Sequence, residues 1–275
     1  MRQPPPIVLT FSANDPSGGA GVHADILTLA SLGCHSLSAI TAVTVQDTAG
    51  IDDIMALDPE VVADQARAVL EDMPVHAFKT GLLGSVEIIA VIAEVISDYP
   101  DIPLVMDPVL ASGRGDELAS EEMVYAMNEL LLPQATILTP NSLEARRIVQ
   151  YEDDDDQELD LNQCANRLLQ SGCEYVLITG AHENTLQVVN TLYGVDGVVR
   201  SDKWQRLEGS YHGSGCTLAS AIAASLANGM SVYDSVYEAQ RYTWQTLKAG
   251  FRPGMGQYLP DRLFWAKEDA EEDKS

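Results

Sequence analysis

The stretch IVLTFSANDPSGGAGVHADILTLASL, residues 7–32, joins a short apolar run to an amphipathic segment through a glycine-rich turn. Ile7–Phe11 has the length and composition of a buried strand, and Gly21–Leu32 has apolar residues at helical spacing. The turn between them, Asp15–Gly21, is rich in glycine. A strand that leads through a tight turn into a helix is the repeating unit of α/β proteins.

The same alternation continues along the rest of the chain. Further strands are predicted at Leu37–Val45, Ala77–Leu83, Leu104–Val109, Thr136–Thr139 and Tyr175–Thr179. Further helices are predicted at Glu60–Leu70, Val86–Ile96, Glu121–Leu131, Leu161–Gln170, Gly213–Asn228 and Val232–Ala249. This order predicts an α/β fold with a central, mostly parallel sheet and helices on both faces. Val188–Tyr193 and Gly197–Arg200 are expected to add an antiparallel hairpin.

No linker or internal repeat divides the chain, so we expect a single domain over residues 1–275 with flexible tails at 1–6 and 267–275. Glu152–Asp156 is an acidic run that we interpret as a solvated loop. No apolar run approaches the about 20 residues needed to cross a bilayer, and the N-terminus lacks the pattern of a signal peptide. We therefore expect a cytoplasmic protein with four free cysteine thiols.

The charge of the chain limits its partners. With 41 acidic and 16 basic residues the formal net charge is −25, which argues against nucleic acid and anionic membranes as partners. Two interpretations of this acidity stay open, adaptation to high salt or an ordinary acidic enzyme. In either case, a site for a polyanion must supply its own positive potential.

The strongest local motif is Gly213–Thr217, GSGCT, at the start of an apolar helix. A helix N-terminus presents unpaired N–H groups and a partial positive charge, and glycine allows a phosphate to approach the backbone. Such a site suits phosphoryl transfer, which depends on positioning and charge stabilisation. Cys216 lies where the helix dipole is expected to lower a thiol pKa. The alternative is a glycine-rich cap with Cys216 as a core residue.

The turn DPSGGAG at Asp15–Gly21 matches neither of the common nucleotide-binding glycine patterns. It nevertheless follows a strand, at the edge of the sheet where open α/β proteins bind ligands. The alternative is a tight turn capped by Asp15.

Polar residues follow other strands too. Asp107 ends one strand, and Asn141 and Glu144 follow another, so their side chains are candidates for a Mg²⁺ site. Asp and Asn are equally common as loop and cap residues. Gln46 follows a strand and could pair with an aminopyrimidine edge. His212, just before the GSGCT motif, could contact a phosphate or be a packing residue.

Taken together and in order, DPSGGAG, VQDT, KTGLL, MDPV, TPNSLEA and GSGCT closely resemble the motifs of the hydroxymethylpyrimidine/phosphomethylpyrimidine kinases of thiamine biosynthesis, in the ribokinase-like superfamily. The resemblance extends from about Ile7 to Trp265. It implies a three-layer α/β/α sandwich, a homodimer, and ATP-dependent phosphorylation of 4-amino-5-hydroxymethyl-2-methylpyrimidine and then of its monophosphate.

The resemblance also implies residue roles. Gln46 and Asp25 would bind the pyrimidine substrate, and Cys216 would act on the acceptor hydroxyl beside the anion-binding residues Gly213, Ser214 and Gly215. Asn141, Glu144 and Thr179 would lie at the nucleotide, with Mg²⁺ held near Asp107 and Glu144.

The chain departs from the family pattern at Thr179, where a phosphate-contacting lysine is usual; this puts the second phosphorylation in question. Ala13 replaces a glycine that is common in the first-strand loop. A pyridoxal or pyridoxine kinase and a non-catalytic pyrimidine-binding protein of the same fold stay open as alternatives. A sugar kinase fits less well because Cys216 stands where its aspartate base would be.

Overall fold

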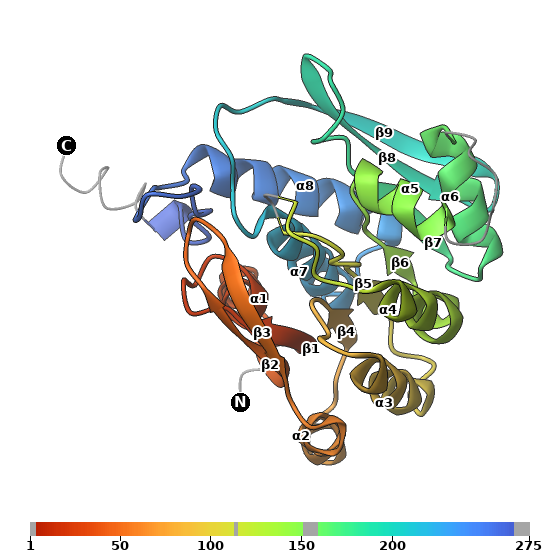
Figure 1. Ribbon diagram of the computed structural model, residues 1–275. Helices are drawn as coiled ribbons and strands as arrows, with labels where there is room; N and C mark the ends of the chain where they lie inside the picture. The colour runs from red at the N-terminus through yellow and green to blue at the C-terminus, as the bar shows by residue number, and fades with distance from the viewer. Residues whose placement is uncertain (1–3, 113–114, 151–158, 267–275) are drawn as a thin grey trace.

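The computed structural model describes residues 4–112, 115–150 and 159–266, in which a single mixed sheet lies between two layers of helices (Figure 1). The sheet order is β3-β2-β1-β4-β5-β6-β7-β8-β9. The strands are β1 (Ile7–Asn14), β2 (His35–Gln46), β3 (Ile51–Ala56), β4 (Ala77–Thr80), β5 (Leu104–Met106), β6 (Ile137–Leu138), β7 (Tyr175–Ile178), β8 (Gln187–Gly194) and β9 (Gly197–Gln205). Within this order, the six consecutive strands β2-β1-β4-β5-β6-β7 pair in parallel. Strand β3 is antiparallel to β2, β8 is antiparallel to β7, and β9 is antiparallel to β8.

Helices cover both faces of this sheet, as predicted. They are α1 (Gly21–Ser31), α2 (Pro59–Asp72), α3 (Val86–Ser97), α4 (Glu121–Ala126), α5 (Ser142–Gln150), α6 (Leu161–Gln170), α7 (Ser214–Ala227) and α8 (Val232–Lys248). A π-helical turn, η1 (Met127–Leu131), and a 3₁₀ turn, η2 (Leu132–Gln134), follow α4. One apolar core joins the sheet to α2 through α6, and the other joins it to α1, α7 and α8. In β1, Leu9 faces the first core and Val8 the second, because successive side chains of a strand point to opposite faces.

The sequence missed two elements. Strand β3 was not predicted, because exposed Asp52 and Asp53 hide its strand character; it lies at the edge of the sheet and pairs with β2. Helix α5 was not predicted either, although Ser142 begins a helix that packs Ile148 into the core. The predicted β8–β9 hairpin is confirmed.

The parallel strands end at one edge of the sheet, where the loops after β1, β5, β6 and β7 gather. Strand β5 ends at Met106, earlier than predicted, so Asp107 begins the loop beyond it. All four cysteines are free thiols, as expected. Within the described ranges, no helix is long and apolar enough to cross a membrane. Residues 1–3 and 267–275 of the predicted tails, and the acidic run, lie outside the described residues.

Candidate active site

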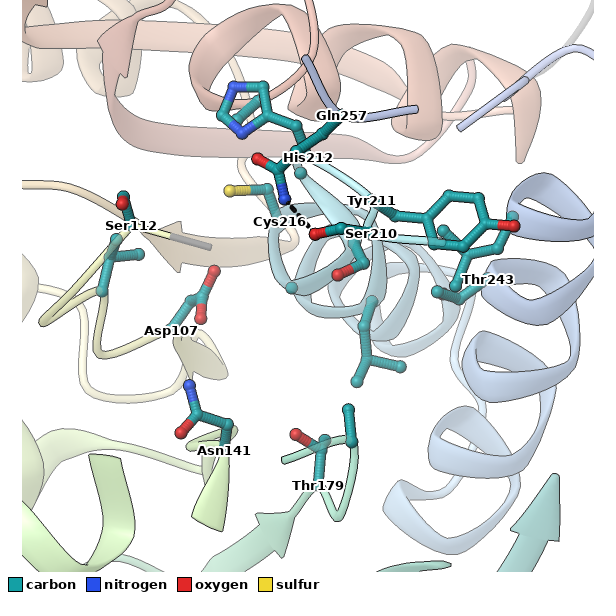
Figure 2. A pocket seen from close by; sticks show the side chains of 18 of the residues that line it. Asp107, Ser112, Asn141, Thr179, Ser210, Tyr211, His212, Cys216, Thr243 and Gln257 are labelled. Atoms are coloured by element: carbon teal, nitrogen blue, oxygen red, sulfur yellow. Dashed lines mark hydrogen bonds between the residues drawn. The ribbon is translucent and has the colours of Figure 1, made fainter. Parts of the chain in front are cut away.

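A cavity of about 430 Å³ lies at the carboxyl ends of the parallel strands (Figure 2). Most of the predicted site residues line it, although they come from distant parts of the chain. They are Gln46, Asp107, Asn141, Glu144, Thr179, Gly213, Ser214, Gly215 and Cys216. This is the edge at which open α/β sheets bind ligands, and the volume suits a small-molecule site.

The first turn of α7 forms part of the cavity wall. Gly213 precedes the helix with φ of +84°, and the first intrahelical bond runs from Thr217 N–H to the Gly213 carbonyl at 3.0 Å. The backbone N–H groups of Ser214, Gly215 and Cys216 come before that bond and belong to the unpaired donors of the helix N-terminus. The start of α7 therefore presents backbone donors to the cavity, an arrangement suited to an anion.

The Asp15–Gly21 turn interlocks with this helix start. A Cβ atom added at Gly213 would lie 1.9 Å from the Gly19 carbonyl oxygen, so no side chain fits between the two loops. Asp15 accepts hydrogen bonds from Ser17 N–H at 2.8 Å and Ala20 N–H at 2.7 Å, which confirms its capping role. Its Oδ2 also lies 2.8 Å from His212 Nε2, so His212 is paired with Asp15.

The charge on Asp15 is well stabilised. Burial would raise the pKa of the Asp15 carboxyl, but hydrogen bonds with His212, Gln46 and Ser17 bring this pKa far below its usual range. Gln46 thus lies beside the turn, with its amide on the cavity wall. Asp15 is a permanently charged anchor that joins three segments of the site.

Cys216 differs from the prediction. Burial raises the pKa of its thiol to about 12, and the nearby Asp107 and Asp25 raise it further, although Lys79 acts in the opposite direction. The prediction of a lowered pKa was wrong, because burial and two carboxylates outweigh the partial charge of the helix. The thiol lies close enough to the Asp107 carboxylate to influence its pKa. Burial and the two carboxylates therefore favour the protonated thiol at Cys216.

Asp25 does not lie on the cavity wall, contrary to the role implied by the resemblance. Its side chain is fully buried and pairs with Lys79 Nζ at 2.9 Å, and Ser220 Oγ donates to it at 2.7 Å. Burial alone would lower the pKa of Lys79, but the negative charges of Asp25 and Asp107 keep it above its usual value. The ion pair lies behind the site and supports it from the core.

Sequence reasoning missed Lys79 as a site residue, since it lies inside an apolar strand. That position was itself a signal, because a lysine is almost never fully buried unless it is paired.

Asp107 and Glu144 lie close enough to influence each other. Burial raises the pKa of Asp107 to about 6, with Lys79 opposing this shift; burial and the charge of Asp107 raise the pKa of Glu144 to about 8. Asp107 Oδ2 is buried and has no hydrogen-bond partner, and Figure 2 shows the carboxylate pointing toward the cavity. Each of these observations fits a site for a cation, and Mg²⁺ is usually held by only one or two carboxylates plus water and phosphate.

Glu144 and Asn141 have a structural role as well. Asn141 Oδ1 accepts from Glu144 N–H at 2.9 Å, and Glu144 Oε2 accepts from Asn141 N–H at 2.9 Å. This reciprocal pair is a capping box at the start of α5. Glu144 Oε1 also accepts from Leu110 N–H at 3.3 Å, so both of its oxygens are engaged. Of the two carboxylates, Asp107 has the free oxygen.

Thr179 lies directly after β7, lines the cavity, and pairs with Asn141 through an isolated parallel β-bridge of the backbone. The loop that follows is held by Arg206, which sequence reasoning also missed. Arg206 donates to the carbonyls of Ala181 at 2.7 Å and Glu183 at 2.9 Å, and it lines the cavity. The chain thus has a cation on this wall, engaged with the loop backbone.

Known proteins resemble both this sequence and this arrangement. A family model described as phosphomethylpyrimidine kinase matches residues 15–261. The chain belongs to the phosphomethylpyrimidine kinase family. A protein of Streptomyces coelicolor named hydroxymethylpyrimidine/phosphomethylpyrimidine kinase is 40% identical over 256 residues, 92% of each chain. A protein of the same name from Mycobacterium tuberculosis is 40% identical over 262 residues, 94% of each chain.

Solved structures of two kinds resemble the phosphomethylpyrimidine kinase fold seen here. The pyridoxal kinase of Staphylococcus aureus in complex with ADP has a TM-score of 0.86 and 29% identity, covering 96% of this chain and 95% of that one. The phosphomethylpyrimidine kinase of Clostridium difficile has a TM-score of 0.75 and 32% identity, covering 88% and 99%. The predicted ribokinase-like fold is confirmed.

Proposed function

We propose that this protein transfers the γ-phosphate of ATP to 4-amino-5-hydroxymethyl-2-methylpyrimidine and then to its monophosphate, as a phosphotransferase of thiamine diphosphate biosynthesis. The observation that carries the proposal is the convergence, in one cavity, of the Gly213–Cys216 helix start with Gln46 and Asp107. The names of the relatives at 40% identity support the choice of substrate.

The first loop would hold the acceptor. The Gln46 amide can donate to and accept from an aminopyrimidine edge at once, and its contact with Asp15 orients it. The unpaired N–H groups of Ser214, Gly215 and Cys216 would stabilise charge on the transferred phosphoryl group. Asn141, Glu144 and Thr179 lie on the opposite wall, where the nucleotide would bind.

Cys216 would orient the acceptor hydroxyl rather than remove its proton at the outset. Burial keeps the thiol protonated and Cys216 lines the cavity, so its sulfur lone pairs can accept from the hydroxymethyl group. Phosphoryl transfer passes through a loose transition state, so in-line placement of the hydroxyl matters more than early deprotonation. The proton can leave late, to an oxygen of the new phosphate.

Mg²⁺ would be held by Asp107 through its free Oδ2, with Glu144 beside it. When bound, the ion would neutralise the charge that develops on the leaving diphosphate. Among the described residues no group of three or more acidic, histidine or cysteine side chains could hold a metal, so phosphate and water would complete the coordination.

We also propose a cytoplasmic homodimer, as the resemblance implies. The edge formed by β2 and β3 exposes Val45 by 57% and Met55 by 67%, which supports a surface for a second copy. Sedimentation velocity of the full chain measures this directly, and a monomer at micromolar concentration would contradict it.

The test of the activity is ADP release with Mg²⁺ and three separate acceptors: hydroxymethylpyrimidine, its monophosphate and pyridoxal. We expect turnover on the first two. Pyridoxal is included because pyridoxal kinases have the higher TM-scores among these structures. Turnover on pyridoxal alone would move the protein to that activity, and ligand binding without turnover would support a non-catalytic pyrimidine-binding protein.

A further inference from the structure

Arg262 is a buried cation behind the start of α7. Only 3% of it is exposed, and its guanidinium donates to Thr217 Oγ1 at 3.0 Å, to the Gly19 carbonyl at 2.5 Å and to the Gly213 carbonyl at 3.4 Å. None of the ion pairs found in the described part of the chain involves Arg262. Arginine keeps its charge when buried, so the positive charge of Arg262 is stabilised here by hydrogen bonds to backbone and hydroxyl oxygens.

These contacts fall where the two loops of the site meet. The Gly19 carbonyl approaches Gly213 too closely for any side chain, and both carbonyls point their oxygens at the same guanidinium. Thr217 Oγ1 accepts from Arg262 and itself donates to the Gly213 carbonyl at 2.8 Å. One guanidinium thus fixes both the distance between the loops and the direction of the first helical turn.

The segment that carries Arg262 is itself well held. Tyr242 Oη donates to the Arg262 carbonyl at 2.7 Å. Upstream, Tyr258 N–H donates to the Ser210 carbonyl at 2.9 Å, and the Tyr258 carbonyl accepts from His212 N–H at 2.9 Å. Figure 2 shows the neighbouring contact between Gln257 and Ser210. The guanidinium therefore projects from a segment hydrogen-bonded to the residues that lead into the anion site.

We propose that Arg262 is a positioning residue for phosphoryl transfer: it holds the backbone N–H groups of Ser214–Cys216 in place and adds buried positive charge behind them. The inference rests on the proposed function. A site for ATP needs positive charge, yet the net charge of this chain is −25 and Thr179 stands where the resemblance implies a lysine. Arg262 would supply part of that positive charge. Positive potential would come from behind the anion site, in addition to any cation on the opposite wall.

The test compares Arg262→Met, Arg262→Ala and Arg262→Lys with wild-type protein and with Arg252→Met. Arg252 is a matched control: it is exposed, lies in the same segment and donates to the carbonyls of Gly256 and Met255, away from the anion site. For each protein, kcat and KM for ATP are measured together with thermal unfolding, and the Ala variant is also assayed with added guanidinium ion.

A positioning role predicts that Arg262→Met lowers kcat about 100-fold while KM for ATP changes less than about threefold. Free guanidinium should restore part of the kcat of Arg262→Ala, Lys should be intermediate because it lacks the planar fork, and Arg252→Met should match wild type. A purely structural arginine would lower the amount of folded protein without changing kcat per folded molecule.

Normal kcat in folded Arg262→Met would overturn the inference. If that variant does not fold, wild-type kcat in Arg262→Lys would overturn it instead, as would failure of guanidinium to restore any kcat to folded Arg262→Ala. If the wild-type protein is inactive on every acceptor, the proposed function is refuted and this inference with it. The wild-type assay therefore distinguishes failure of the proposed function from failure of the role of Arg262 alone.

Discussion

Two walls of the cavity differ in how they are built: the α7 wall, formed by Gly213–Cys216, and the β7 wall, formed by Thr179 and the loop that follows it. An arginine donates hydrogen bonds to the backbone of each wall. On the α7 wall, Arg262 is buried and bonds the carbonyls of two interlocked loops. On the β7 wall, Arg206 is half-buried and bonds a loop whose Leu186 is 97% exposed. The α7 wall is closely packed at Gly213, whereas the loop of the β7 wall includes an exposed side chain.

This difference suggests a division of labour. Stabilising a transferred phosphoryl group requires donors fixed before the reaction, which the α7 wall provides. On the β7 wall, where we propose that the nucleotide binds, the chain has Thr179 at the position for which the resemblance implies a lysine. We infer that the chemistry depends on the α7 wall and that the β7 wall adjusts affinity.

The largest effect is expected from Gly213→Ala, which breaks the α7 wall directly. A Cβ atom would collide with the Gly19 carbonyl, and the residue has a positive φ. We expect a loss of kcat of about 1,000-fold, because several backbone donors would move together. Gly229→Ala is the matched control, since Gly229 has a φ of +83° with open space around it. Equal kcat for the two variants in steady-state assays would contradict the account.

Cys216→Ala should come next, with a loss of about 100-fold in kcat and little change in ATP affinity. The thiol is expected to orient the acceptor hydroxyl, so the loss belongs to the chemical step. Cys34 precedes β2, and its buried thiol contacts the Ala224 carbonyl near the far end of α7, so Cys34→Ala should keep full activity. Unchanged turnover in Cys216→Ala would remove this residue from the mechanism.

The carboxyl group of Glu144 should make the stability of the protein depend on pH. Glu144 has a folded pKa raised to about 8 from 4.5, so between these values the folded protein binds more protons than the unfolded chain. The free energy of unfolding should therefore fall as pH rises through this window.

Urea unfolding with EDTA measures this slope. Glu144→Gln should remove roughly 2 kcal/mol of the decline between pH 5.5 and 7.5. Glu183→Gln is the contrasting variant, because a hydrogen bond from Arg146 lowers the pKa of Glu183 and its contribution is lost only in acid. Identical slopes for wild type and Glu144→Gln would show that Glu144 is ionised in the free protein.

The smallest effect is expected on the β7 wall. Thr179→Lys should tighten ATP binding about fivefold, the value of one partly screened charge contact. Ser201→Lys introduces the same charge at an exposed position outside the cavity and serves as the control. Calorimetric titration with ATP gives both affinities; a gain of many hundredfold would mean that the wild-type wall is defective rather than adjusted.

Much of the fold could be predicted because strand and helix periods are local properties of the chain. The strands β1, β2 and β7 and the helices α1, α6 and α7 were placed within a few residues. Edge strand β3 escaped, since its exposed aspartates hide the alternation of a strand.

The site was less predictable, because its decisive contacts join residues far apart in the chain. The pKa of Cys216 depends on its burial and on the charges of Lys79 and Asp107, and no local motif reveals that these residues lie close together. Asp25 was assigned to the substrate by resemblance, yet it lies behind the wall with Lys79. Arg262 lies in none of the motifs quoted above, so the sequence alone did not indicate it.

The most direct test of the division between the walls is a single-turnover measurement of phosphoryl transfer from labelled ATP to hydroxymethylpyrimidine, at saturating nucleotide, by wild type and Thr179→Lys. The account predicts that wild type transfers at a rate within about tenfold of the variant, because fixed donors on the α7 wall dominate the chemical step. No transfer by wild type together with rapid transfer by Thr179→Lys would contradict it.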